Sequence, residues 1–309
     1  MNRSNAQIIR LWIMFVVLNI CITICCFAQD TESQIAKMLP EIPAELTEPS
    51  QRVEFLLLHF WDNFNFSDTT FLMNDNLLEH SFVDFIDLLS LAPDDISEKS
   101  ILSLLKKSEV IHRQFLFILK LSERYLYEQE SPLCNEERLI PFLRYAVQSP
   151  ALQDVEKIRP KFMLENISKN RIGTVANDFT YTLMNGENNN LHAIKADFTL
   201  LYFNDPDCED CRMLIGQLVA SPIVNQFIQS GKLKIITVYV NDDWESWKKH
   251  AEEVLQSWIY SYDAKQKINT ENLYNIKQFP SMYLLDQNKR VILKDTTFEK
   301  LEVFLMKTS

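Results

Sequence analysis

Glycine is confined to one part of this chain. The 309 residues include only four glycines, and the first of them is Gly173. Tight hairpin turns require positive φ angles, which glycine adopts most readily, so a long segment without glycine is hard to build from β-hairpins. We therefore predict that the residues before Gly173 form helices and that any β-sheet follows it.

Hydrophobic periodicity supports a helical N-terminal part. Apolar residues recur there at helical spacing, as in Phe115, Ile118 and Leu119. The prolines of this part fall near expected helix ends or first turns, where proline is tolerated. We predict helices over residues 52–61, 77–91, 96–106, 110–127, 136–147 and 152–167.

The pattern changes after Gly173. Strand-like apolar runs cover residues 179–184, 198–203, 234–240, 281–285 and 291–294, with helical patterns between them. Such alternation indicates a sheet flanked by helices. The expected fold class is α plus α/β. An all-helical domain over residues 29–170 would be followed, through a linker near residues 168–178, by a domain over residues 171–309 with a central mixed sheet flanked by helices.

The first 28 residues have the pattern of a secretory signal peptide. Arg3 and Arg10 precede an apolar run without acidic residues, and a cleavage point is expected after Ala28. An uncleaved membrane anchor remains open, because the apolar run approaches spanning length. A lipoprotein with lipid on Cys25 or Cys26 is the other alternative.

Charge and cysteine usage exclude two classes of protein. The formal net charge is −11, and loss of the two arginines of the signal would make it −13. Nucleic acid is not an expected partner, because binding it depends on a basic surface. Cleavage would leave Cys134, Cys208 and Cys211, which are too few for an exported scaffold held together by disulfides.

The pair Cys208 and Cys211 carries the expected chemistry. It follows the apolar run of residues 198–203 through a short turn and opens an amphipathic stretch beginning at Arg212. A sulfur at a helix N-terminus faces free backbone N–H groups and the positive end of the helix dipole, which favour thiolate. Cys208 is expected to attack a disulfide, and Cys211, one turn further on, to resolve the mixed disulfide.

A structural disulfide and half of a metal site are the other interpretations of this pair. Zinc would need two further ligands, and the five histidines, at positions 59, 80, 112, 192 and 250, show no paired spacing. We expect no metal and no cofactor. Cys134, in a predicted loop, is interpreted as an incidental thiol.

Residues 200–211, taken with residues 274–286, resemble a thioredoxin fold of the TlpA-like, alkyl hydroperoxide reductase-related kind. A Cys-x-x-Cys motif is followed, 72 positions after Cys208, by Pro280 in a Phe-Pro pair that precedes a strand. The resemblance covers residues 172–309. It implies a cis peptide between Phe279 and Pro280 beside the dithiol, with residue 279 offering its backbone to an extended substrate.

Residues 39–43 and 52–68 resemble a helical domain of unknown function that precedes thioredoxin-like domains in exported Bacteroidetes proteins. This second resemblance implies no activity. It implies the periplasm or cell envelope of a Gram-negative cell as the location.

Several positions depart from the thioredoxin pattern. Asp207 replaces the usual aromatic residue before the first cysteine, and Glu209 and Asp210 replace Gly-Pro between the cysteines. Tyr202 stands where thioredoxins place a buried acid that assists proton transfer. The proton-transfer group is therefore unassigned, with Glu209 or a water molecule as alternatives. Asp205, where related peroxidases place Thr or Ser, disfavours a peroxidase.

These features predict an exported thiol-disulfide oxidoreductase. Negative charge beside a sulfur opposes thiolate formation, so the disulfide is held more firmly and the couple is expected to work in the reducing direction. The carboxylates that crowd the pair are Asp205, Asp207, Glu209 and Asp210. The expected partners are protein thiols or disulfides of the envelope and an upstream electron donor. A membrane is an expected partner only if the chain is lipidated or keeps its anchor.

The alternative function is that of a non-catalytic envelope binding or assembly protein with a thioredoxin-like scaffold.

Overall fold

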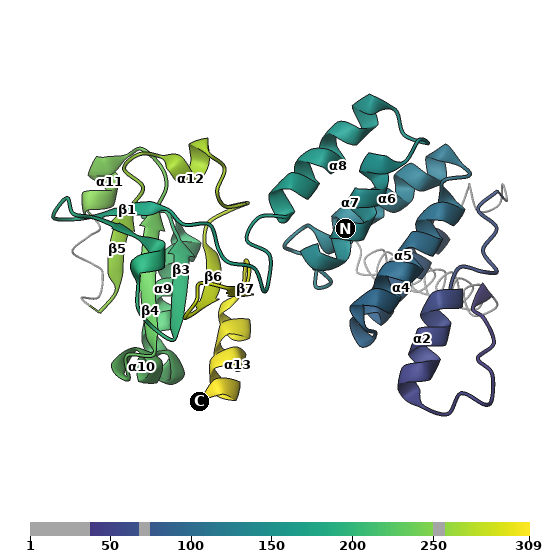
Figure 1. Ribbon diagram of the computed structural model, residues 1–309, viewed down its shortest axis with the longest axis horizontal. Helices are drawn as coiled ribbons and strands as arrows, with labels where there is room; N and C mark the ends of the chain where they lie inside the picture. Colours follow the sequence, from purple (N-terminus) through teal and green to yellow (C-terminus); the bar gives the residue numbers. More distant parts are fainter. Residues whose placement is uncertain (1–37, 68–74, 250–256) are drawn as a thin grey trace, which may run out of the picture. The chain divides into compact units, whose positions relative to one another are not determined.

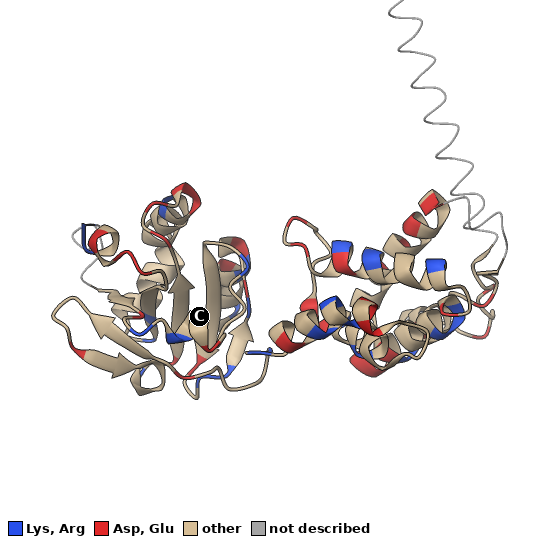
Figure 2. Ribbon diagram, turned by 90° about the horizontal axis from the view of Figure 1, so that it is seen from above, with Lys and Arg blue, Asp and Glu red and all other residues tan. Residues whose placement is uncertain are grey.

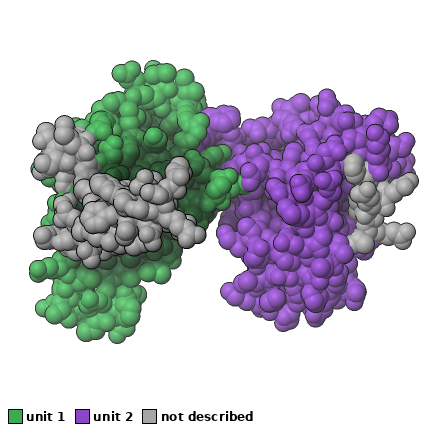
Figure 3. All heavy atoms as spheres, turned by 180° about the vertical axis from the view of Figure 1, so that it is seen from behind, with its two compact units in different colours: residues 1–161 green, residues 162–309 purple. Residues whose placement is uncertain are grey.

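The computed structural model describes residues 38–67, 75–249 and 257–309. The chain divides into two compact units, residues 1–161 and residues 162–309 (Figure 3). The predicted signal peptide, residues 1–28, lies outside the described residues. The predicted domain boundary at residue 170 stays a prediction.

The described part of the N-terminal region is helical (Figure 1). Its helices overlap the ranges predicted from hydrophobic periodicity, which confirms the all-helical interpretation. Pro141 lies inside its helix rather than near an end, where burial of its neighbours outweighs the cost of proline. The elements are α2 (Pro49–His59), α4 (Asp75–Leu88), the 3-10 turn η1 (Leu89–Leu91), α5 (Asp94–Ser108), α6 (His112–Leu126), α7 (Glu136–Gln148) and α8 (Asp154–Ile167).

The core of the helical unit is rich in aromatic rings. Trp61 lies at ring-centroid distances of 4.6 Å from Phe64 and 5.4 Å from Phe85, and all three side chains are buried. Phe82 on α4 lies 5.9 Å from Phe142 on α7. Because burial of one phenylalanine ring stabilises a fold by about 1.5–3 kcal/mol, this packing accounts for much of the helical unit's stability.

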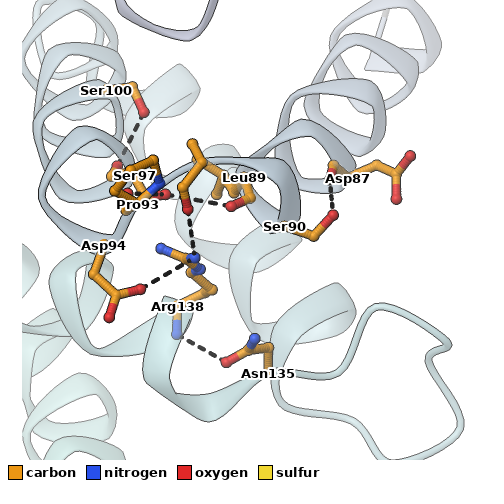
Figure 4. A network of polar contacts seen from close by, with 10 residues as sticks. Asp87, Leu89, Ser90, Pro93, Asp94, Ser97, Ser100, Asn135 and Arg138 are labelled. Atoms are coloured by element: carbon orange, nitrogen blue, oxygen red, sulfur yellow. Dashed lines mark hydrogen bonds and ion pairs between the residues drawn. The ribbon is translucent and has the colours of Figure 1, made fainter. Parts of the chain in front are cut away.

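A polar network links the start of α5 to α7 (Figure 4). The Ser97 hydroxyl, which is buried, lies 3.3 Å from the carbonyl of Leu89 and 3.0 Å from that of Pro93. Arg138 of α7 donates to the carbonyl of Ala92, at 3.4 Å, and pairs with Asp94, at 3.2 Å. The carbonyls of Leu89 and Pro93 also accept from the backbone N–H groups of Ala92 and Ser97, so the serine hydroxyl is a second donor to each. The arginine ties the turn before α5 to α7.

Charged residues of both signs occur along the helices of the N-terminal unit (Figure 2). Arg124 pairs with Glu79 at 2.6 Å, and Arg144 pairs with Glu98 at 3.1 Å, each bridging two helices. Both arginines are about half exposed. Exposed pairs of this kind contribute at most about 1 kcal/mol each, so the apolar core, and not these pairs, holds the helices together.

The C-terminal unit contains a seven-stranded sheet in the order β2-β1-β5-β4-β3-β6-β7. β3 is parallel to β4 and β4 to β5, whereas the other pairings are antiparallel. This arrangement confirms the predicted mixed sheet. The strands are β1 (Thr180–Leu183), β2 (Asn188–Asn190), β3 (Phe198–Phe203), β4 (Leu233–Tyr239), β5 (Ile259–Tyr262), β6 (Ser281–Asp286) and β7 (Val291–Leu293).

Apolar side chains of the central strands fill both faces of the sheet. Along β3, Leu200 and Tyr202 join the core cluster that includes Leu214, whereas Leu201 and Phe203 join the cluster on the other side. Burial on both faces explains why β3 reads as a continuous apolar run. The helical elements of this unit are η2 (Leu191–Ala193), α9 (Glu209–Ala220), α10 (Pro222–Gln229), α11 (Trp244–Lys249), α12 (Lys267–Thr270) and α13 (Phe298–Thr308).

The segment expected as a linker hydrogen-bonds to the C-terminal sheet. Gly173 donates its N–H to the carbonyl of Val291, and Ala176 donates to that of Lys289, each at 2.8 Å. Val175 forms an isolated antiparallel bridge with Arg290. Residues 173–176 therefore extend the sheet beyond β7.

In residues 38–67, 75–249 and 257–309, no helix is long and apolar enough to cross a membrane.

Candidate active site at the Cys208–Cys211 turn

Cys208 occupies the N-cap position of α9. Its backbone is extended, with φ −80° and ψ 120°, and its sulfur accepts a hydrogen bond from the N–H of Cys211 at 3.2 Å. The side chain is half-buried. A sulfur in this place lies against the N–H groups and the positive dipole end of the helix, which stabilise negative charge.

Cys211 lies beneath the first sulfur and is only 1% exposed. Burial raises the pKa of its thiol to about 12, and the neighbouring Cys208 adds to this rise, whereas the backbone of Asp205 and the hydroxyl of Tyr202 oppose it. Both thiols are free, so the structure shows the dithiol state. At neutral pH Cys211 is protonated and shielded, which leaves Cys208 as the accessible nucleophile.

The loop before β6 borders the dithiol. The Phe279–Pro280 peptide is cis, as the resemblance to thioredoxins implies. The Sγ of Cys208 lies 3.8 Å from the carbonyl oxygen of Phe279. The fold thus brings together the four residues that the sequence predicts for the site: Cys208, Cys211, Phe279 and Pro280.

Two of the four carboxylates near the pair are held by hydrogen bonds. Asp205 accepts from the side-chain amide of Asn241 at 2.8 Å, and Asp207 accepts from the hydroxyl of Ser246 at 3.0 Å. Glu209 and Asp210 lie in the first turn of α9 and are exposed. The carboxylates expected from the sequence therefore surround Cys208. Asp205 and Asp207 are held by hydrogen bonds, whereas Glu209 and Asp210 extend into solvent.

The sequence does not single out Asn241 or Ser246. Asn241 follows β4, and Ser246 lies in α11, the next helix. Parallel β3 and β4 end at the same edge of the sheet, so the segments that follow them meet there. Parallel pairing of β3 with β4 is therefore the feature from which polar residues after β4 can be expected beside the Cys-x-x-Cys turn.

Tyr202 lies on β3 and contacts the first turn of α9. Its side chain is fully buried, and its hydroxyl donates to the backbone carbonyl of Cys211 at 2.9 Å. Burial raises the pKa of this hydroxyl far above its ordinary value, and the two thiols add to the rise. Tyr202 therefore keeps its proton at neutral pH.

Cys134 lies in the helical unit, half-buried, 3.7 Å from the carbonyl of Tyr127. Within the described ranges, no group of three His, Cys, Asp or Glu side chains is placed to hold a metal ion.

Two families match the chain. A domain of unknown function (DUF5106) matches residues 23–170, and a thioredoxin-like family matches residues 196–291. No curated protein matches.

Several solved structures from Bacteroides are similar to the chain. A thioredoxin-like protein from Bacteroides caccae is 39% identical, covers 88% of this chain and 98% of its own, and superposes with a TM-score of 0.84. The C-terminal domain of an uncharacterized protein from Bacteroides fragilis is 42% identical over 45% of this chain and 99% of its own, with a TM-score of 0.44. The thioredoxin domain of a thiol-disulfide oxidoreductase from Bacteroides vulgatus is 24% identical over 45% of this chain and 97% of its own, with a TM-score of 0.40.

The match to the Bacteroides caccae protein extends over nearly all of that protein and includes both the helical and the thioredoxin-like part. The chain therefore belongs to the thioredoxin-like family, with an N-terminal domain of unknown function.

Proposed function

We propose that the protein is an exported thiol-disulfide oxidoreductase that reduces disulfides of envelope proteins. One observation carries this proposal: the half-buried sulfur of Cys208 caps α9 and accepts the N–H of Cys211, whose own thiol is buried and protonated. An accessible nucleophile over a shielded second thiol is the arrangement that dithiol exchange requires.

The exchange needs no cofactor. The Cys208 thiolate attacks one sulfur of the substrate disulfide, forms a mixed disulfide and expels the other sulfur as a thiolate. Cys211 then attacks Cys208, which releases the substrate as a dithiol and leaves a Cys208–Cys211 disulfide. An upstream dithiol donor returns two electrons and two protons to the pair. Phe279 and Pro280 border the reacting sulfur, where the backbone of an extended substrate would lie.

The charges around the pair support the reducing direction. Asp205 and Asp207 are held in the turn before α9, and Glu209 and Asp210 lie in its first turn. Negative charge destabilises a nearby thiolate, and a dithiol whose thiolate is poorly stabilised gives up its electrons more readily. The effect is moderate because Glu209 and Asp210 are exposed and solvent screens them.

Export to the periplasm or cell envelope is part of this proposal. It rests on the signal-like pattern of residues 1–28. A lipid on Cys25 or Cys26, or a retained anchor, would keep the same site at a membrane surface.

Reduction of insulin by a thiol donor tests the activity. The full chain should accelerate the reaction, whereas Cys208→Ser should add nothing to the rate of the donor alone. Cys134→Ser is the matched control, because Cys134 is a cysteine of the helical unit outside the pair, and it should retain full activity. Equal turnover by the unmodified chain and by Cys208→Ser would contradict the proposal and favour a non-catalytic scaffold.

A further inference from the structure

Tyr202 links the central sheet to the buried thiol of the pair. Its hydroxyl lies 2.9 Å from the carbonyl oxygen of Cys211, in the first turn of α9. The same hydroxyl lowers the pKa of the Cys211 thiol and so partly offsets the larger rise caused by burial. One buried hydroxyl thus bonds to the backbone of Cys211 and lowers the pKa of its thiol against the effect of burial.

Resolution of a mixed disulfide requires that Cys211 lose its proton. Burial raises the pKa of this thiol to about 12, so its thiolate is scarce at neutral pH. A hydrogen-bond donor aimed at the sulfur stabilises the anion, and hydrogen bonds to charged groups are roughly twice as strong as those between neutral groups.

Tyr202 is suited to donate a hydrogen bond and not to accept a proton. Its hydroxyl pKa is raised by burial, so it carries its proton throughout the working pH range. A tyrosine hydroxyl has a single hydrogen, which rotates about the C–O bond. In the dithiol this hydrogen is donated to the carbonyl of Cys211. Rotation about the C–O bond is the movement that would turn it toward the sulfur of the same residue.

The groups that act on Cys211 come from three directions. Cys208 lies in the same turn, the backbone of Asp205 precedes α9, and Tyr202 reaches from β3. The side chains that complete the surrounding core cluster, such as Leu214 and Met282, are apolar. On its own helix, the exposed carboxylates Glu209 and Asp210 precede Cys211 and the exposed Arg212 follows it.

We propose that Tyr202 is a positioning residue for the resolution step, an inference that rests on the proposed dithiol exchange. Cys211 attacks Cys208 in the mixed disulfide, so the Cys208–Cys211 bond forms and the bond between Cys208 and the substrate breaks. The substrate sulfur leaves with the electron pair and takes a proton from solvent, and the proton of Cys211 passes to solvent. Tyr202 donates its hydrogen bond to the attacking sulfur and keeps its own proton.

Reaction of the reduced chain with dithiobis(nitrobenzoate), an aromatic disulfide, separates the two steps. Attack by Cys208 releases one coloured thiolate, and resolution by Cys211 releases a second. The experiment uses the full chain with its other cysteines replaced by serine, so that only the pair reacts. These cysteines are Cys21, Cys25, Cys26 and Cys134.

Tyr202→Phe should leave the first phase unchanged and slow the second about tenfold, with the pH profile of the second phase moved about one unit higher. Tyr274→Phe is the matched control. Tyr274 is also a buried tyrosine whose hydroxyl donates to a backbone carbonyl, that of Asn177 at 2.6 Å, and its substitution should change neither phase. A merely structural role of Tyr202 would not shift the pH profile of one phase alone.

An unchanged rate and pH profile of the second phase in Tyr202→Phe would overturn the inference and leave the proposed function standing. Absence of both phases in the parent chain, or release by Cys208→Ser at the parent rate, would overturn the proposed function and the inference with it. If Tyr202→Phe does not fold, fluorotyrosine at position 202 keeps the ring and donates a stronger hydrogen bond. It should accelerate the second phase about twofold, and an unchanged second phase would overturn the inference.

Discussion

The two cysteines differ chiefly in their access to solvent. Cys208 is half-buried at the start of α9, whereas Cys211 is 1% exposed. The spacing of the motif predicts which sulfur attacks, because only the first one caps the helix. The raised pKa of Cys211 depends on side chains from β3 and β6 that pack over it, and local sequence does not show them.

Alkylation should follow this asymmetry. At about pH 8, iodoacetamide should modify Cys208 and leave Cys211 intact, because a thiol with a pKa raised to about 12 is almost wholly protonated there. In Cys208→Ser, labelling of Cys211 should rise about tenfold per pH unit. Mass spectrometry of the peptides measures both rates, and preferential labelling of Cys211 in the unmodified chain would reverse the assigned roles.

The same shift affects stability. The folded state binds the Cys211 proton more tightly than the unfolded chain does, because burial raises the pKa above its ordinary value of 9.0. The stability that this group contributes is therefore complete below pH 9.0 and is lost as the pH rises through about 12.

At the scale of elements, the turn between β3 and α9 is held by the segment that follows β4. Asn241 and Ser246 bond to Asp205 and Asp207, the residues that lead into Cys208. The turn is therefore fixed from outside as well as by its own helix cap.

Removal of one of these bonds should loosen the site. Asn241→Ala should lower the free energy of unfolding by about 1 kcal/mol and change the alkylation rate of Cys208, because the Asp205 carboxylate loses a partner. Asn225→Ala is the control, since Asn225 donates a bond of the same length, 2.8 Å, to the carbonyl of Val219. Thermal unfolding and alkylation measure the two effects. If the control changes the Cys208 rate equally, Asn241 has no special place in the site.

The elements that the sequence predicts are those with a clear hydrophobic period. The helices of the N-terminal unit belong to this class, whereas the buried strands β3 and β6 are predicted from continuous apolar runs. β2 consists of three asparagines, which have low strand propensity, and is extended because Asn188 and Asn190 bond to the hydroxyls of Thr182 and Thr180 on β1. β5 is only four residues long, too short to show a period.

At the scale of the whole molecule, the prediction of two parts agrees with the two families that match the chain. The resemblance of residues 200–211 and 274–286 identified the C-terminal fold because a Cys-x-x-Cys turn and a distant Phe-Pro pair constrain it together. In the helical part, the sequence predicts where the helices lie from their hydrophobic periodicity. It contains no motif there that points to a reaction.

Export predicts a defined N-terminus. Protein recovered from the envelope fraction should begin at Gln29, because Cys26 and Ala28 are small residues three before and one before the expected cut. N-terminal sequencing and intact mass measure it. Retention of residues 1–28 would indicate an anchored protein, and an added acyl mass would indicate a lipoprotein.

The reduction potential of the Cys208–Cys211 pair decides between a reducing and an oxidising role. It is measured by equilibration in glutathione or thioredoxin buffers, followed by alkylation and mass spectrometry. We predict a single two-electron couple confined to this pair, with a potential closer to the roughly −270 mV of thioredoxin than to the roughly −120 mV of a strong periplasmic oxidant. Neutralisation by Glu209→Gln and Asp210→Asn should make it more oxidising, by about 10–20 mV for each charge. A potential near that of the strong oxidants, or a shift to more negative values in the neutralised variant, would contradict the reducing role.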